Sequence, residues 1–221
     1  VEDAIPGSPA AKAGLGTGDV IESINNVSTR DMPLAFAEQL LQGDAGTAVE
    51  FSVLRLQRTE AQKMSVVRAA ISYPGVTGKV QGSTGIIQVQ GLQPGRVNDV
   101  AAQVAALEKQ GAKKLVLDMR HCSTGAHEDG AALANLFQSS GLITYTQGQK
   151  SAKQEFQAQA SKAVTKSPLA VIVNRSTAGG CEIAAASLLQ SKRAQLVGER
   201  TYGDAANLPP TRAHKPTDGD M

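Results

Sequence analysis

Several residue types are scarce in this chain, and each scarcity argues against a class of protein. Tryptophan is absent and aromatic residues make up 3% of the chain, which argues against a stacking platform for single-stranded nucleic acid. Two cysteines, Cys122 and Cys181, are too few for a disulfide scaffold. No apolar run approaches the roughly 20 residues that span a membrane. The net charge of +2 comes without a basic cluster typical of nucleic-acid binding, so we expect no nucleic-acid partner.

What the chain does contain is typical of a globular protein. Hydrophobic residues make up 41% and charged residues 19% of its 221 positions. That length suits one large domain or two ordinary ones. The first residue is Val1 and the pattern starts in the middle of a motif, so we expect Val1 not to be the natural start of the protein.

The first sixty residues predict short elements separated by small-residue turns. Ser8 and Pro9 are suited to the start of a short helix, which Gly14 would end. Alternating residues predict strands over 20–24 and 48–55, and an apolar stripe predicts a helix over 33–41. Residues 58–70 are polar and predict a passage into a second unit.

The rest of the chain predicts an α/β unit. Residues 66–92 alternate between glycine turns, which indicates short strands. Beyond them, strands and helices alternate: strands are expected over 114–120, 168–174 and 194–198, and helices over 98–110, 129–136 and 182–190. This order favours a largely parallel sheet covered by helices. In such sheets ligands bind at the carboxyl ends of strands, here the loops after Met119 and Asn174.

The motifs of the first unit resemble a PDZ domain of the bacterial kind; they lie at residues 6–10, 13–15, 18–21 and 43–47. The resemblance implies capture of peptide or protein C-termini by strand addition. It implies that the helix carrying Leu34, Ala37 and Glu38 contacts the peptide, although core packing also explains that helix. The carboxylate-binding loop and first strand of a PDZ domain would precede Val1, so we expect only part of the groove.

The second unit, taken with the first, resembles the C-terminal processing peptidases, or tail-specific proteases. The matching segments are residues 85–87, 111–120, 129–137, 182–188 and 197–203. The fold class is therefore mixed α/β: a partial PDZ domain over 1–65 and a crotonase-like core with a largely parallel sheet and a polar tail over 66–221. The family implies an extracytoplasmic location and no cofactor, and homo-oligomerisation stays open.

These peptidases use a serine activated by a neutral lysine, with backbone N–H groups stabilising the oxyanion. Aligned through Glu182, the serine position falls on Gly179. Aligned through Tyr202 and Gly203, the lysine position falls on Asp204, and the supporting glutamine on Leu208. The sequence thus predicts a peptidase fold without its catalytic side chains. Gly125 and Gly180 remain as candidate oxyanion-type N–H donors.

Other residues near the same turn leave alternatives open. Ser176, Thr177 and Cys181 are candidate relocated nucleophiles, with His121 or His127 as a base for the cysteine. Cys181 also suits a small buried helix residue, or a disulfide with Cys122. A zinc site built from the two cysteines and two histidines is the remaining reading, on irregular spacing. The leading hypothesis is a proteolytically inactive peptide- or protein-binding protein; an active hydrolase with a relocated nucleophile and a structural oligomerisation module are the alternatives.

Overall fold

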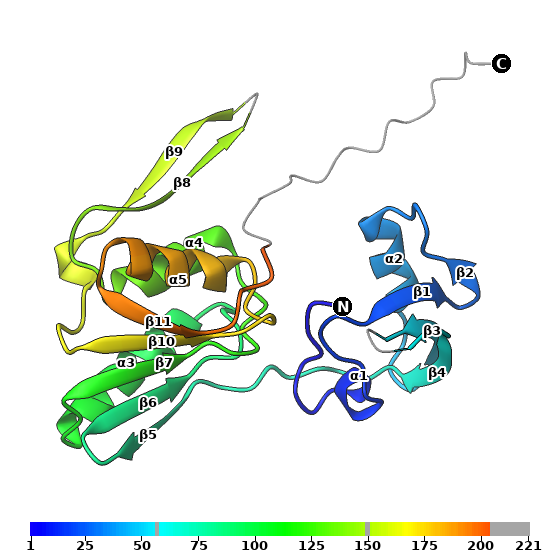
Figure 1. Ribbon diagram of the computed structural model, residues 1–221, viewed down its shortest axis with the longest axis horizontal. Coiled ribbons are helices and arrows are strands. Elements are labelled where there is room, and N and C mark those ends of the chain that lie inside the picture. The colour runs from blue at the N-terminus through cyan, green and yellow to red at the C-terminus, as the bar shows by residue number, and fades with distance from the viewer. Residues whose placement is uncertain (56–57, 149–150, 204–221) are drawn as a thin grey trace.

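A computed structural model describes residues 1–55, 58–148 and 151–203, and shows two lobes joined by a linker (Figure 1). The N-terminal lobe holds one antiparallel sheet in the order β2-β1-β3-β4. Its elements are α1 (Pro9–Lys12), β1 (Val20–Ile24), β2 (Val27–Ser28), α2 (Leu34–Leu41), β3 (Ala48–Leu54) and β4 (Gln62–Val67).

Local sequence signals explain how the helices of this lobe begin and end. The Ser8 hydroxyl accepts a hydrogen bond from the N–H of Ala11 and Pro9 opens α1, as expected. The end of α2 is held differently, because the Arg68 guanidinium donates to the carbonyl oxygens of Leu40 and Leu41. A small core lies inside the lobe; its buried members are Leu15, Ile24, Val49, Phe51, Val53 and Val66.

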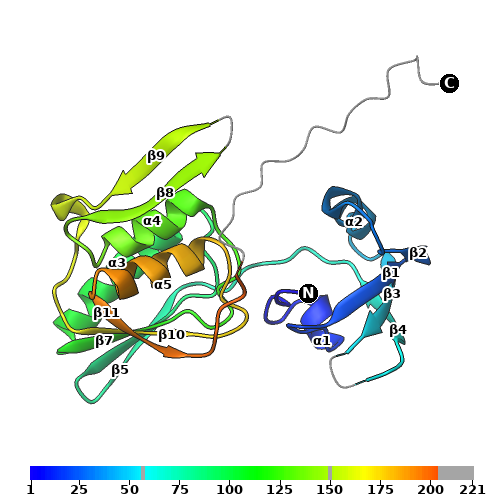
Figure 2. The same ribbon diagram turned by 45° about the horizontal axis from the view of Figure 1, so that its top comes forward.

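The C-terminal lobe is built on a five-stranded sheet in the order β11-β10-β7-β6-β5. Strands β6, β7, β10 and β11 are parallel to one another, and β5 is antiparallel to β6. Helix α3 packs on β5 and β6, whereas α4 and α5 lie together beside the sheet (Figure 2). The elements are β5 (Thr77–Gln81), β6 (Thr84–Gln88), α3 (Arg96–Lys109), β7 (Lys114–Asp118), α4 (His127–Asn135), β10 (Leu169–Val173), α5 (Gly180–Gln190) and β11 (Ala194–Gly198).

A separate antiparallel hairpin extends away from this sheet (Figures 1 and 2). It consists of β8 (Leu142–Gly148) and β9 (Ser151–Gln157), and a short 3-10 turn, η1 (Ala160–Lys162), leads back to the sheet. Across the described ranges, no helix has both the length and the apolar character needed to cross a membrane.

Each strand and helix predicted between residues 98 and 198 is found, and the mixed α/β class is confirmed. The prediction for residues 58–70 is wrong in part, because β4 forms there and pairs with β3, placing Met64 opposite Phe51. Polar side chains on β4 concealed a strand whose inward residue is Val66. The expected domain boundary at residue 65 falls inside β4, so the division into 1–65 and 66–221 stays a prediction. The β8–β9 hairpin was not anticipated.

Candidate functional site

The turn after β10 is held by its own polar side chains. The N–H of Asn174 donates to the Thr177 hydroxyl, and the N–H of Ser176 donates to the side-chain oxygen of Asn174. The Thr177 hydroxyl in turn donates to the carbonyl of Met119, at the end of the neighbouring strand β7. These bonds join the carboxyl ends of two adjacent parallel strands, which is where ligand sites form in such sheets.

Gly179 occupies the turn at the start of α5 with an unusual backbone, φ +56° and ψ −124°. Residues with a side chain rarely adopt this conformation, so glycine relieves strain there. Among the described residues, a Cβ at this position would meet only the carbonyl oxygen of Gly125, 3.9 Å away, so this part of the chain leaves space there. Strained strand-to-helix turns of this kind present the nucleophile in other hydrolases. Here position 179 carries no side chain.

Glu182 ties this turn to the segment that leads to position 204. Its buried carboxylate accepts hydrogen bonds from the N–H of Gly179 at 3.1 Å and from that of Gly203 at 2.7 Å. The N–H of Tyr202 donates to the carbonyl of Thr177. Gly179, the expected serine position, and Gly203, next to the expected lysine position, therefore share one carboxylate. Asp204 and Leu208 themselves lie outside the described residues.

The role of Glu182 was not foreseen from the sequence, where it served only to align the motif. A signal was present, however. A Glu three residues after a helix N-cap commonly reaches back to the N-cap N–H, and Glu182 stands in this relation to Gly179.

The loop after β7 faces the turn and approaches it closely. A Cβ on Gly180 would lie 2.5 Å from the carbonyl oxygen of Ala126 and 3.0 Å from that of Gly125, so only glycine fits. Within the described ranges, the N–H groups of Gly125 and Gly180 donate no hydrogen bond. Their use as oxyanion-type donors stays a prediction.

Cys122 and Cys181 form a disulfide that cross-links this loop to the first turn of α5, with Cα atoms 6.0 Å apart. Both cysteines are fully buried. Since the sulfur of Cys181 is bonded, the cysteine nucleophile and the zinc site that the sequence left open do not form in this structure. No group of three or more metal-ligating side chains occurs in the part of the chain that the structure describes.

The two hydroxyl candidates are also engaged. Thr177 is fully buried, and its hydroxyl donates to Met119 and accepts from Asn174. Ser176 is nearly as buried, and its hydroxyl lies 2.5 Å from that of Thr17 in the N-terminal lobe. The Nδ1 atom of His121 lies 3.4 Å from the carboxylate of Asp3.

The contacts of Thr17 and Asp3 place the N-terminal lobe against both loops of the site. Thr17 meets the turn after β10, and Asp3 meets the loop after β7. Tyr202, which precedes Gly203, lines a cavity that otherwise consists mainly of residues from the N-terminal lobe. The cavity of the N-terminal lobe thus reaches Tyr202, whose N–H donates to the carbonyl of Thr177 in this turn.

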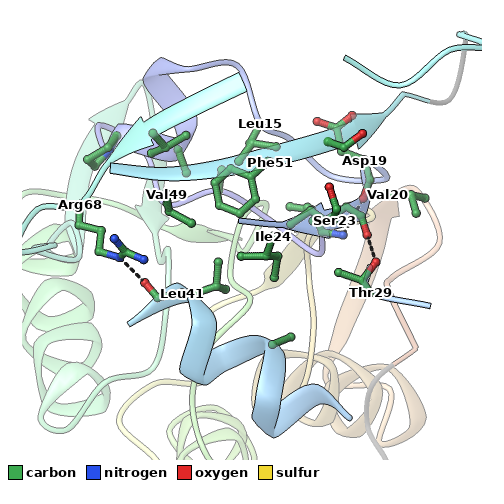
Figure 3. Close-up of a pocket in the computed structure, with 18 of the residues that line it drawn as sticks. Leu15, Asp19, Val20, Ser23, Ile24, Thr29, Leu41, Val49, Phe51 and Arg68 are labelled. Carbon is green, nitrogen blue, oxygen red and sulfur yellow. Dashed lines mark hydrogen bonds between the residues drawn. The ribbon is translucent and has the colours of Figure 1, made fainter. Parts of the chain in front are cut away.

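That cavity lies between the sheet of the N-terminal lobe and α2 (Figure 3). Of the three predicted peptide contacts, Ala37 lines it. Leu34 and Glu38 lie on the same helix, but the positions of their side chains are outside what the structure describes. Peptide contact by the three residues stays a prediction.

Asp118, at the end of β7, forms a charged pair with Arg120 near the site. Its buried carboxylate accepts two hydrogen bonds from the Arg120 guanidinium, at 2.9 and 2.7 Å, and one from the Arg120 N–H. Burial raises the pKa of Asp118, but the hydrogen bonds and charge of Arg120 outweigh burial and hold the pKa below its usual value.

This pair predicts a loss of stability in acid. A carboxyl whose folded-state pKa is depressed stabilises the fold above its unfolded pKa, about 3.9, and that stabilisation is lost as the pH falls through the lower, folded-state value. We expect Asp118→Asn to be less stable than the unmodified chain at pH 7, and the difference to shrink below about pH 4. Urea unfolding between pH 2 and 7 measures it. Asp99→Asn, which breaks the exposed pair with Arg96, is the control; an equal pH dependence in both variants would contradict the assignment.

The two lobes and this turn define a class: an α/β core of peptidase type, joined to a small domain with a peptide-sized cavity. A model of peptidase family S41 matches residues 83–214, and a PDZ-domain model matches residues 1–55. The chain belongs to peptidase family S41, in the branch of C-terminal processing peptidases, and carries a PDZ domain.

Individual relatives agree. The chain is 32% identical over 212 residues to carboxyl-terminal-processing peptidase 2, chloroplastic, of Arabidopsis thaliana, a match covering 92% of this chain and 41% of that protein. It is 32% identical to the carboxy-terminal processing protease CtpA of Bacillus subtilis, over 90% of this chain and 43% of that protein. The solved photosystem II D1 C-terminal processing protease superposes with a TM-score of 0.83 at 26% identity, covering 92% of this chain and 57% of that one. The chain thus spans less than half the length of these two curated relatives.

Proposed function

We propose that this chain is a proteolytically inactive member of its family that binds peptide or protein segments, C-termini included. The observation that supports this most directly is Gly179, a residue without a side chain at the position of the family's serine. Asp204 at the lysine position cannot act as a neutral amine base, and Leu208 offers no hydrogen bond where the family has glutamine.

The state of the alternative nucleophiles supports the same proposal. Cys181 is in a disulfide, Thr177 is buried against a backbone carbonyl, and Ser176 faces a hydroxyl. A serine or threonine hydroxyl needs an adjacent base to attack a peptide bond. The hydroxyls of Ser176 and Thr177 contact a hydroxyl, a backbone N–H and a backbone carbonyl among the described residues, and none of these groups is a base. The disulfide also supports the extracytoplasmic location that the family implies, because such bonds persist in oxidising compartments.

Incubation with an unstructured protein such as casein tests the proposal. We expect the full 221-residue chain to cleave it no faster than buffer alone. Cleavage that disappears in Ser176→Ala or Thr177→Val would show that a nucleophile has moved, and would overturn the proposal.

Restoring the missing groups tests whether the geometry of the cleft persists. We expect the triple variant Gly179→Ser, Asp204→Lys, Leu208→Gln to gain measurable proteolysis, because the space at Gly179 is open and Glu182 holds the flanking segments together. The matched control is the triple variant Gly179→Ala, Asp204→Lys, Leu208→Gln. It carries the same backbone strain, of the order of 1–3 kcal/mol, without a hydroxyl. A folded triple variant as inert as its control would show that the cleft has changed elsewhere.

A further inference from the structure

The β8–β9 hairpin projects from the C-terminal lobe as a sheet of two strands (Figures 1 and 2). Ile143 and Phe156 pack against the main core, and β8 contacts α4 and α5. Strand β9 lies on the far side of β8 from these helices in both figures. Among the described residues, β9 pairs with β8 alone. Two-stranded sheets are at best marginally stable in water, so the outer edge of β9 is a place where a further strand would add stability.

The outer edge of β9 is long and carries balanced charge. The strand contains seven residues and no proline, and its register with β8 is regular over residues 154–156. Proline, short length and an exposed lysine are common means of keeping edge strands apart. Lys153 is such a lysine, but its Nζ atom lies 2.6 Å from a carboxylate oxygen of Glu155. The two side chains therefore share one face of β9, where their exposed fractions are 44% and 42% and their charges cancel.

The order of charges on β9 is self-complementary. Lys153 and Glu155 stand symmetrically on either side of Gln154 in the sequence. When two copies of β9 run antiparallel with Gln154 at the twofold axis, Lys153 of each chain lies opposite Glu155 of the other. Opposite charges directly across two antiparallel strands attract, and like charges there repel. Each chain uses the same surface in this arrangement, as a closed dimer with twofold symmetry requires.

We propose that β9 pairs antiparallel with the β9 of a second copy of this chain, and that the two hairpins form one continuous sheet in the order β8-β9-β9-β8. Backbone hydrogen bonds along the two edges and the Lys153–Glu155 pairs between the chains hold this sheet together. A single seam of strands buries less than the roughly 1,200–2,000 Å² of a standard interface, so we expect a dissociation constant of about 10–100 μM. The inference goes beyond the proposed function and does not depend on whether the chain cleaves peptides.

Charge reversal tests the pairing. In sedimentation equilibrium at low salt, we expect the unmodified chain to dimerise reversibly. Lys153→Glu or Glu155→Lys alone places like charges across the seam at both pairs, and should raise the dissociation constant about tenfold. Mixing the two variants in equal amounts should restore dimerisation, because every glutamate then lies opposite a lysine. Glu199→Lys, which breaks the exposed pair with Arg175, is the control and should leave the dissociation constant unchanged.

A cysteine at the twofold axis tests the register. Directly opposed residues of antiparallel strands have Cα atoms about 4.5–5.5 Å apart, within the range that a disulfide spans. Gln154→Cys should therefore form a covalent dimer under mild oxidation. The two native cysteines are already joined to each other, so they do not compete for the new thiol. Lys79→Cys, on the β5 edge of the main sheet, is the control and should cross-link much more slowly.

Three results would overturn the inference. The first is a chain that stays monomeric well above the expected dissociation constant. The second is a dimer that neither single reversal weakens, or a mixture of the two reversed variants that stays monomeric, because either places the contact on another surface. The third is cross-linking of Gln154→Cys no faster than that of Lys79→Cys. Circular dichroism spectra that match the unmodified chain show that a variant has lost the contact and not the fold.

Discussion

The double variant Cys122→Ala, Cys181→Ala should unfold with a free energy about 4 kcal/mol lower than that of the unmodified chain. The disulfide closes a loop with a sequence separation of 59 residues, and the chain-entropy relation gives about 4 kcal/mol for a loop of that length. Both cysteines are fully buried in the main core, so no solvent-exposed group offsets the loss of the cross-link. Guanidinium unfolding of the two proteins, without reductant, measures the difference.

Reduction provides the control for this prediction. Unmodified protein unfolded in dithiothreitol should approach the stability of the double variant, because both then lack the cross-link. The double variant itself should not respond to dithiothreitol. Two free thiols titrated in the native, unreduced protein, or equal stability with and without reductant, would contradict the bond. Cys122 and Cys181 join the loop of Gly125 to the turn of Gly179. The double variant should therefore also hold these two segments together less firmly.

Gly130→Ala should lower the free energy of unfolding by about 3 kcal/mol, near the upper end of the usual cost of overpacking. Gly130 lies in α4 where this helix meets the start of α5. A Cβ there would lie 2.1 Å from the carbonyl oxygen of Gly180 and 2.9 Å from its Cα. Those atoms are backbone, so they cannot rotate away, and the two helices must separate. The helix propensity gained by alanine, about 1 kcal/mol, offsets only part of the strain.

Gly16→Ala is the matched control for the helix contact. Its Cβ would meet nothing within 4 Å, and its φ is not in the left-handed region. Thermal or denaturant unfolding should therefore show little change for Gly16→Ala and a large loss for Gly130→Ala. Similar stabilities for the two variants would mean that α4 and α5 pack less closely than described.

Most elements of the C-terminal lobe were predictable because their patterns are local. The run of apolar residues over 169–173 gives β10, and helical stripes give α3 and α5. Prediction failed where stability comes from a partner strand. The polar strand β4 forms because β3 presents its backbone to it, and the β8–β9 hairpin forms by pairing with itself. Neither β4 nor β8 has the apolar character that marks a buried strand in sequence.

The features of the candidate site also divide into those that follow from the sequence and those that depend on the fold. The sequence by itself determined which side chains stand at positions 179, 204 and 208, because residue identity needs no coordinates. That these are the family's serine, lysine and glutamine positions stays a prediction. The sequence left the state of Cys181 open among a thiol, a zinc ligand and a disulfide. The tertiary structure decided this, since only the packing of the loop after β7 against α5 brings Cys122, 59 residues away in sequence, within bonding distance. The space at Gly179 and the shared carboxylate of Glu182 likewise depend on segments that meet only in the fold.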